Sequence, residues 1–403
     1  MNKKCHSEGA QRPKSLLPKL RFPEFQDSPA WEKKTLGELG DVVASGDLNT
    51  EYFSPTPSLQ YIYPVFSNSI GQEGLYGYYS VSKYPKDSVT ITARGTLGVA
   101  FLRKQDFMGI GRLIVVSDLK DTNPKFLTEG WNHLVIIPQE VTSIPQLTAI
   151  TAKSIALPFP SLPEQQKIAD CLTALDDLIA AQSQKVEALQ AYKKGLMQNL
   201  FPAEGESVPR LRFPEFESAG GWETKTLGEL GDVFMCKRIF AEETHTSNGV
   251  PFFKIGTLGG KPDAFISKDL FDEYKSKYNF PRKGEILITC SGTVGKCLVY
   301  DGNDAYYQDS NIVWIDNPTL EISNEFLYNI LLNVDWGKLN STTITRIYMS
   351  DLRDLSIVYP ANPKEQQRIA ELLSAVDEEI SAQGEAVAAL KVHKRGLMQR
   401  LFV

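Results

Sequence analysis

The side chains best suited to acid–base, nucleophilic or metal chemistry are scattered along this sequence. His133 and His245 have no Ser, Cys or acid nearby in a recognisable nucleophile motif. Asp176 and Asp177 are neighbouring carboxylates of the kind a nuclease uses, but they fall within a predicted helix, where a solvated face is expected. The five cysteines include no CxxC pair, and the four histidines complete no zinc spacing. We therefore expect neither a catalytic centre nor a metal site in this chain.

An internal repeat is the strongest pattern in the sequence. The segment PKLRFPEF at 18–25 recurs as PRLRFPEF at 209–216, and TLGELGDV at 35–42 recurs at 226–233. Later in each half, EQQKIA at 164–169 returns as EQQRIA at 365–370. Each half therefore has a common opening, a variable middle and a common helical close.

The two middles share one short glycine motif, ITARGTLG at 91–98 and ITCSGTVG at 288–295. A Gly-Thr-x-Gly segment after a strand is typical of a tight turn, because glycine adopts positive φ without strain. It is not a phosphate-binding loop, since Cys290 occupies the position of the first glycine in that motif. Short β-branched and aromatic runs broken by Gly, Pro, Asn and Asp predict mixed α/β, strand-rich domains in both middles.

Both closing segments predict a long helix with a coiled-coil seam, because apolar residues recur in alternating steps of four and three. Polar residues interrupt the seam at matching places, Gln182 with Gln383 and Lys193 with Lys394, where they fix register or orientation. The pattern alone also fits bundle core or a homodimer zipper, but two matched copies in one chain favour an intramolecular pair. The apolar seam residues are Ile168, Leu172, Leu175, Ile179, Val186, Leu189, Ile369, Leu373, Val376, Ile380, Val387 and Leu390.

The starts of these helices are marked by capping signals. Ser161 with Glu164, and Asn362 with Glu365, have capping-box spacing, and a proline falls in each first turn. From Ile168 to Leu200 the first seam would form a rod of about 48 Å.

Composition indicates a multi-domain globular protein. The 403 residues exceed one typical domain, and 42% are hydrophobic and 23% charged. A secretory signal and a run of apolar residues long enough for a membrane span are both missing, so we expect a soluble protein of the reducing cytosol. The net charge of −6 argues against a protein that binds nucleic acid by bulk electrostatics alone.

Together these features resemble the specificity subunit of type I restriction-modification enzymes. The similarity rests on the duplicated half-chain and on similar helices opened by PEQQKIA at 163–169 and PKEQQRIA at 363–370. It covers nearly everything from Pro18 to Val403.

The resemblance implies two target recognition domains, each reading one half of a bipartite DNA site, and two long helices packed antiparallel as a coiled-coil spacer. A rod of this length would let two domains meet duplex DNA more than one turn, about 34 Å, apart. The implied boundaries are a flexible tail at 1–17, recognition domains at 18–155 and 204–355, and spacer helix regions at 156–203 and 356–403.

The resemblance also implies partners that carry out the chemistry in this form of phage defence. Two methyltransferase (M) subunits would methylate adenine with S-adenosylmethionine, and translocase/nuclease (R) subunits would use ATP and Mg. The chain itself would bind double-stranded DNA, no cofactor and no membrane, and would act in the cytoplasm as a non-enzymatic subunit.

Base edges and phosphates are contacted mainly by Arg, Lys, amide and hydroxyl side chains on a rigid support. In the first domain such residues cluster near predicted strand ends with tyrosines interleaved, and the second domain has counterparts. The candidate DNA-binding residues are Lys83, Lys86, Arg94, Thr96, Arg103, Lys104 and Arg112, and then Lys237, Arg238, Lys254, Arg282, Lys283, Lys296, Gln308, Arg346 and Tyr348.

Two other classes remain open at the level of sequence. A duplicated coiled-coil scaffold that never touches DNA would suit the acidic pI. A stand-alone restriction enzyme is disfavoured because no methyltransferase, motor or nuclease motif appears.

Overall fold

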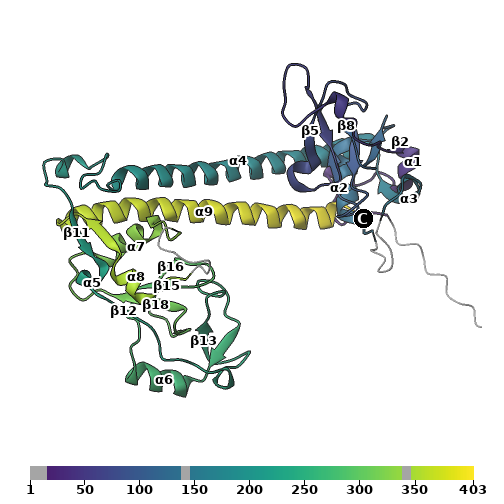
Figure 1. The fold of residues 1–403 in the computed structure, drawn as a ribbon. Coiled ribbons are helices and arrows are strands. Elements are labelled where there is room, and N and C mark those ends of the chain that lie inside the picture. The colour runs from purple at the N-terminus through teal and green to yellow at the C-terminus, as the bar shows by residue number, and fades with distance from the viewer. Residues whose placement is uncertain (1–15, 138–145, 338–345) are drawn as a thin grey trace, which may run out of the picture. The chain divides into compact units, whose positions relative to one another are not determined.

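The computed structural model describes residues 16–137, 146–337 and 346–403, so the predicted tail at 1–17 lies almost wholly outside the described residues. These residues form two compact units (Figure 1). The first unit runs to Ser183 and includes Glu385–Val403, and the second is Gln184–Gly384. Each unit thus combines residues of both sequence halves.

The first unit contains a four-stranded sheet in the order β2-β9-β6-β7, a second sheet in the order β3-β5-β4-β8, and the pair β1-β10. Helices α2 and α3 accompany them, followed by the first part of α4. The bounds are β1 (Glu32–Thr35), α1 (Leu36–Leu39), β2 (Asp41–Ala44), β3 (Phe53–Ser54), β4 (Tyr63–Phe66), β5 (Leu75–Tyr79), β6 (Val89–Ile91), β7 (Ala100–Leu102), β8 (Met108–Gly109), β9 (Ile114–Ser117), α2 (Pro124–Leu134), α3 (Ala149–Ser154), β10 (Ala156–Phe159) and α4 (Leu162–Leu200).

The second unit repeats this plan with a four-stranded sheet in the order β12-β18-β15-β16, a three-stranded sheet in the order β14-β13-β17, and the pair β11-β19. The bounds are β11 (Glu223–Thr226), α5 (Leu227–Leu230), β12 (Asp232–Phe234), β13 (Val250–Phe253), β14 (Ala264–Ile266), α6 (Lys268–Lys277), β15 (Ile286–Thr289), β16 (Cys297–Val299), β17 (Tyr306–Tyr307), β18 (Ile312–Asp316), α7 (Asn324–Asn333), α8 (Met349–Arg353), β19 (Ser356–Tyr359) and α9 (Pro363–Leu401). The predicted fold class, mixed α/β with two repeated domains and a pair of long helices, is confirmed.

The core of each unit is completed by parts of both long helices. In the first unit, Leu172 from the start of α4 and Phe402 from just after α9 share one apolar cluster with Trp31 and Phe126. The Phe126 and Phe402 rings lie 5.2 Å apart between centroids. In the second unit the corresponding cluster joins the end of α4 to the start of α9.

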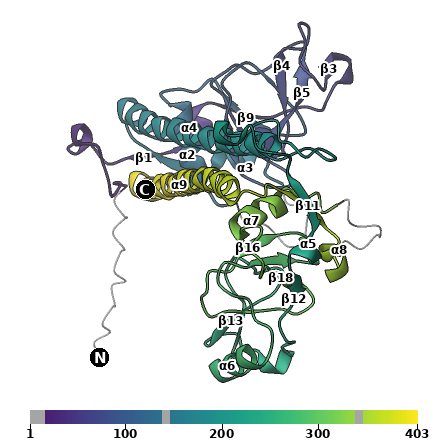
Figure 2. The same ribbon diagram turned by 90° about the vertical axis from the view of Figure 1, so that its left-hand side faces the viewer.

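Within each unit the parts of α4 and α9 lie side by side and run antiparallel (Figures 1 and 2). In the first unit the Lys394 ammonium is 2.8 Å from the Asp176 carboxylate, and in the second Lys193 is 2.6 Å from Asp377. These are the same two positions with the helices exchanged, so the seam lysines fix the same antiparallel register twice. All twelve predicted apolar seam residues are buried or partly buried.

Asp176 does more than the solvated role expected from the sequence. Its carboxylate accepts hydrogen bonds from Lys125 and Lys394, at 2.7 and 2.8 Å. Burial raises the pKa of Asp176, but these two hydrogen bonds outweigh that effect, and the net pKa lies below its usual value of 3.8. Asp176 therefore joins α2 to both long helices of the first unit.

The repeated EQQ motif is explained by contacts with the repeated opening segment. Glu164 accepts hydrogen bonds from Arg21 at 2.7 and 2.8 Å and from the Trp31 indole at 3.3 Å. Glu365 does the same with Arg212, at 2.7 and 2.8 Å, and with the second tryptophan at 3.3 Å. The capping-box role predicted for Glu164 and Glu365 is therefore wrong, because both carboxylates are used to hold the opening segment against the helix.

The following glutamine of the motif joins the helix start to a loop of its own domain. The Gln165 amide donates to the carbonyls of Pro160 and Asp121, at 2.9 and 3.2 Å, and accepts from the Asn123 N–H at 2.9 Å. Gln366 repeats this pattern in the second unit. The sequence segments that are repeated in the two halves thus form the framework that supports each variable middle.

Candidate nucleic-acid interface

The Gly-Thr-x-Gly segment connects β6 to β7 as a tight turn, as predicted. The Thr92 hydroxyl donates to the Thr96 carbonyl and accepts from the Val99 N–H, at 2.5 and 2.9 Å. Gly95 and Gly98 have φ of +69° and +79°, values that side-chain-bearing residues adopt only with strain. The counterpart turn between β15 and β16 has the same hydroxyl contacts from Thr289. This turn projects from the same end of the sheet in both units.

In the first unit, this turn meets two other loops. The Asn68 side chain accepts from the Ala93 N–H and donates to the Gly111 carbonyl, both at 2.6 Å. Arg94 and Arg112 directly follow these two residues and are exposed. Of the predicted DNA-binding residues, the structure therefore brings together Arg94 and Arg112, with Thr96 in the same turn.

The remaining exposed lysines of the first set lie at the opposite end of the same sheet. Lys86 precedes the start of β6, Lys104 follows the end of β7, and both line one hollow with Asp106. Lys83 is exposed beside Tyr84, with its ammonium 5.3 Å from the ring centroid. The predicted first set is thus divided into two groups.

Arg103 is not a surface residue, and its predicted role as a direct DNA contact is wrong. Only 2% of the residue is exposed. Its guanidinium donates to the Thr90 hydroxyl at 2.7 Å and the Glu73 carbonyl at 2.9 Å, and lies 3.6 Å from the Phe66 ring centroid. Burial lowers the pKa of Arg103 to about 10, against the opposing effect of Glu73.

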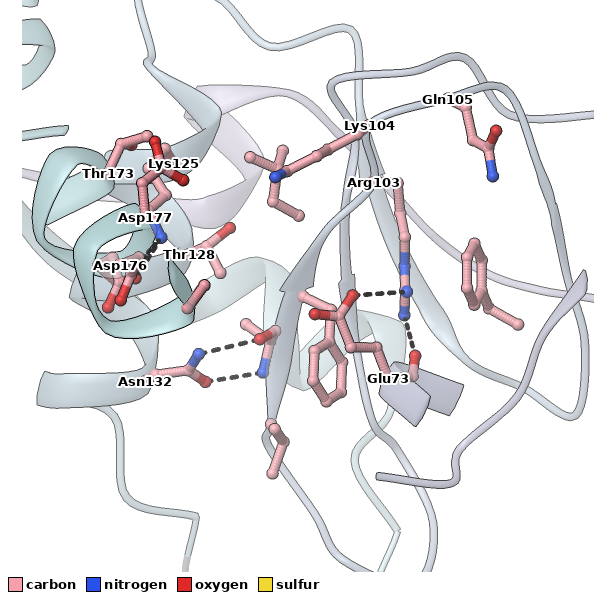
Figure 3. A pocket seen from close by; sticks show the side chains of 17 residues that line it. Glu73, Arg103, Lys104, Gln105, Lys125, Thr128, Asn132, Thr173, Asp176 and Asp177 are labelled. Carbon is pink, nitrogen blue, oxygen red and sulfur yellow. Dashed lines mark hydrogen bonds and ion pairs between the residues drawn. The ribbon is translucent and has the colours of Figure 1, made fainter. Parts of the chain in front are cut away.

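Arg103 also lines a cavity of about 840 Å³ in the first unit, together with residues of α2 and α4 (Figure 3). On one wall the Asn132 amide is hydrogen bonded to both the N–H and the carbonyl of Ala100. On another, Lys125 pairs with Asp176. The polar groups of this cavity therefore join α2 to β7 within the domain and to α4.

In the second unit, the turn after β15 also meets basic side chains from other segments. The Ser291 hydroxyl donates to Asn311 at 2.6 Å, and Arg346 donates to the Ser310 carbonyl at 3.2 Å. Arg238 is 2.8 Å from the neighbouring Asp309 carboxylate and remains mostly exposed.

Further candidates adjoin this group. Tyr348 is 60% exposed, and the Arg346 guanidinium lies 5.7 Å from its ring centroid. The Gln308 side chain accepts from the Ile255 N–H, in the loop that begins with Lys254. Lys296 is the last residue before β16, and its ammonium donates to the carbonyl of Leu258 in that loop.

Other members of the second set lie elsewhere. Arg282 and Lys283 precede β15, at the end of the strand opposite to the turn, and Arg282 lies 3.7 Å from Asp316. The Lys237 ammonium lies 5.2 Å from the Tyr278 ring centroid, where it contacts the region after α6.

Sequence reasoning missed Asn68, Ser291 and Asn311, which hold the loops beside the turns at 92–98 and 289–295 in place. Spacing carried no signal for them, because their partners lie 20 to 43 residues away along the chain. Among the described residues, no group of three or more His, Cys, Asp or Glu side chains is arranged to hold a metal ion. Nor is any helix in the described part of the chain long and apolar enough to span a membrane.

This chain has a repeated framework of sheets with an antiparallel helix pair. Each copy of the framework carries its own surface, at the turn after β6 or the turn after β15, and the two surfaces are similar but not identical. Comparison with known proteins identifies the family. The model of the type I restriction modification DNA specificity domain matches twice, over residues 29–191 and 219–388, and the chain belongs to this family.

Individual relatives agree with this assignment. The chain is 37% identical over 260 residues to a protein of Haemophilus influenzae named as a type I restriction enzyme specificity subunit, covering 64% of this chain and 66% of that protein. It is 24% identical over 403 residues to the MjaIX specificity subunit of Methanocaldococcus jannaschii, covering 92% of each. The solved S subunit of the M. genitalium type I system has the same fold, with a TM-score of 0.63 at 16% identity over 96% of this chain and 99% of that one.

Family membership confirms the predicted class, a DNA specificity subunit of the type I restriction-modification kind. It does not support the alternative of a scaffold unrelated to DNA. The individual DNA-binding residues, apart from Arg103, stay predictions.

Proposed function

We propose that each repeated domain reads one half of a bipartite double-stranded DNA site, and that the chain directs partner subunits to that site from within the cytoplasm. The partners would be two methyltransferase subunits and the translocase/nuclease subunits. S-adenosylmethionine, ATP and Mg would be bound by those partners, which would perform the adenine methylation and the cleavage.

The observation that carries this proposal is that one framework appears twice with different side chains at the same turn. The turn after β6 presents Arg94, whereas the turn after β15 has Ser291 at the corresponding place. Arginine comes from another segment in the second unit, namely Arg346. Surfaces that read different base sequences must differ in this way, while a framework that faces two copies of one partner can stay alike.

The charge of the chain fits a reader that shares the DNA with partners. A net charge of −6 gives little attraction to phosphates over the whole surface. Some of the basic side chains, Arg94 and Arg112 in the first unit and Arg346 in the second, instead lie next to the turns, where Arg and amide side chains are suited to base edges. The partners would neutralise most of the phosphates.

The proposal is tested by sequencing methylated DNA from a host that carries the methyltransferase subunits with or without this chain. We expect a split methylated motif that depends on the chain. Exchanging residues 204–355 for the corresponding domain of another specificity subunit should change one half of the motif only. A motif that changed in both halves, or in neither, would contradict modular reading.

Residue variants locate the reading face. Arg94→Ala and Arg346→Ala should each relax one half of the motif, the half read by the altered domain. Lys86→Ala and Arg282→Ala are matched controls, because Lys86 precedes β6 and Arg282 precedes β15, at the strand ends opposite to the turns. Equal effects of all four variants would show that the turn is not the reading face.

A further inference from the structure

The loop at 67–74 of the first unit has an unfavourable backbone conformation, with three successive residues at positive φ. Gln72, Glu73 and Gly74 have φ of +48°, +53° and +85° in succession. Only glycine adopts this left-handed region freely, so two of the three residues are held there by their surroundings. The Ser67 N–H closes the loop on the Gly74 carbonyl at 2.8 Å.

Arg103 holds this loop through a hydrogen bond from the interior of the domain. Its buried guanidinium donates to the carbonyl of Glu73, in the middle of the left-handed run, at 2.9 Å (Figure 3). The same guanidinium is fixed by the Thr90 hydroxyl and by the Phe66 ring. Its second terminal nitrogen lies 3.9 Å from the Glu73 carboxylate. One buried cation therefore connects the strained loop to the centre of the sheet.

The start of the loop adjoins the proposed reading face of the first domain. Its second residue, Asn68, is hydrogen bonded to the residues preceding Arg94 and Arg112. The side chain of Gln72 is exposed, and Ile70 is 53% exposed. Glutamine pairs with the major-groove edge of adenine through two hydrogen bonds, which makes Gln72 a suitable reading residue beside the two arginines.

The second unit does not repeat this arrangement. Tyr300 occupies the place of Arg103, since its N–H donates to the Glu285 carbonyl as the Arg103 N–H does to Ser88. The Tyr300 hydroxyl donates to Asn303, in the turn that follows its own strand, at 2.8 Å. The buried arginine that holds a loop is therefore found in only one of the two domains.

We propose that Gln72 is a specificity-determining residue of the first domain and that Arg103 is the positioning residue that holds it in reading geometry. This inference rests on the proposed function. Gln72 contacts a base of the first half-site, and Arg103 acts through the backbone of Glu73 without touching DNA.

The test uses the whole chain expressed with its methyltransferase subunits, and the readout is the methylated motif with its base preference at each position. Gln72→Ala should relax one base pair of one half-site, with discrimination there falling by about five- to 150-fold, while the other half-site is unchanged. Gln105→Ala is the matched control, because Gln105 is an exposed glutamine of the same domain that lies outside the loop at 67–74.

Arg103→Met keeps a long apolar stem beside Phe66 but removes both donors. It should relax the same base pair as Gln72→Ala, and Arg103→Lys, which keeps one charged donor, should restore part of the preference. A purely structural role would lower methylation of all sites together without changing the motif. Should Arg103→Met fail to fold, Gln72→Ala alone decides.

An unchanged motif in Gln72→Ala, or relaxation at different positions by the two variants, would overturn the proposal. Loss of the proposed function has another signature, because the unaltered chain would then give no split motif at all, and this inference would fall with it.

Discussion

Each EQQ motif begins with a glutamate that pairs with an arginine of an opening segment, and these two ion pairs give the sharpest test of how the framework is held together. Arg21 and Glu164 form a two-pronged ion pair whose side chains are only 8% and 1% exposed. Arg21→Met leaves the Glu164 carboxylate buried with its main partner removed. Breaking one side of a buried pair costs about 3–5 kcal/mol, because an uncompensated charge remains. For a unit of this size, that corresponds to a fall in melting temperature of about 6–20 °C.

A neighbouring ion pair provides the control. Lys167 and Glu24 lie 3.0 Å apart, but their side chains are 50% and 46% exposed. Lys167→Met should therefore cost much less than Arg21→Met, since water already screens this pair. Both variants alter the contact between the opening segment and the start of α4, so the comparison isolates burial.

Urea denaturation measures the free energy of unfolding, and hydrogen exchange of peptides from the start of α4 and of α9 locates the effect. Arg21→Met should raise exchange at the start of α4, and Arg212→Met should do so at the start of α9. Replacing both Arg21 and Glu164 by methionine should recover much of the loss, because no buried charge is then left. The reasoning is refuted if Arg21→Met costs no more than Lys167→Met.

Three further predictions follow from the geometry. Asp176→Asn should be destabilising at pH 7, and its difference from the unaltered chain in urea denaturation should vanish as the pH falls below 3.8 through the lowered pKa of Asp176. Gly95→Ala should cost about 1–2 kcal/mol from positive φ alone, whereas Gly98→Ala should cost about 1–3 kcal/mol more, because its Cβ would lie 2.7 Å from the partly buried side chain of Ile137; thermal unfolding would show equal losses if this contact did not matter. Arg346→Ala should reduce discrimination at one base pair by about five- to 150-fold and Arg282→Ala should not, as measured by the methylated motif.

The elements that the sequence predicted best are those specified by local periodicity and repetition. The spacing of Ile168, Leu172 and Leu175 is enough to indicate a long helix with a seam, because a helix places residues three and four apart on one face. The recurrence of whole segments indicated two copies of one framework. Both signals depend on residues close in sequence.

The features that the sequence did not predict depend on distant partners. Glu164 has capping-box spacing from Ser161, yet its carboxylate is bonded to Arg21, 143 residues earlier in the chain. Arg103 has the residue type of a DNA contact, yet it follows β7 at a point where its side chain covers Phe66 inside the domain. Neither outcome follows from residue type or spacing, because burial of a charge is decided by long-range packing.

The repeat in sequence is not a repeat of independent folding modules, and this limits how domains can be exchanged. The predicted boundary at 204 separates Phe201 from Trp222 and Phe326, although the three rings share one core. The Trp222 and Phe326 rings lie 5.6 Å apart, as do Trp31 and Phe126 in the first unit. A donor domain must therefore supply the same tryptophan and phenylalanine to receive the end of α4, whatever bases its loops read. The first domain of this chain meets that requirement, so placing a second copy of it at 204–355 should preserve the core while replacing only the reading face.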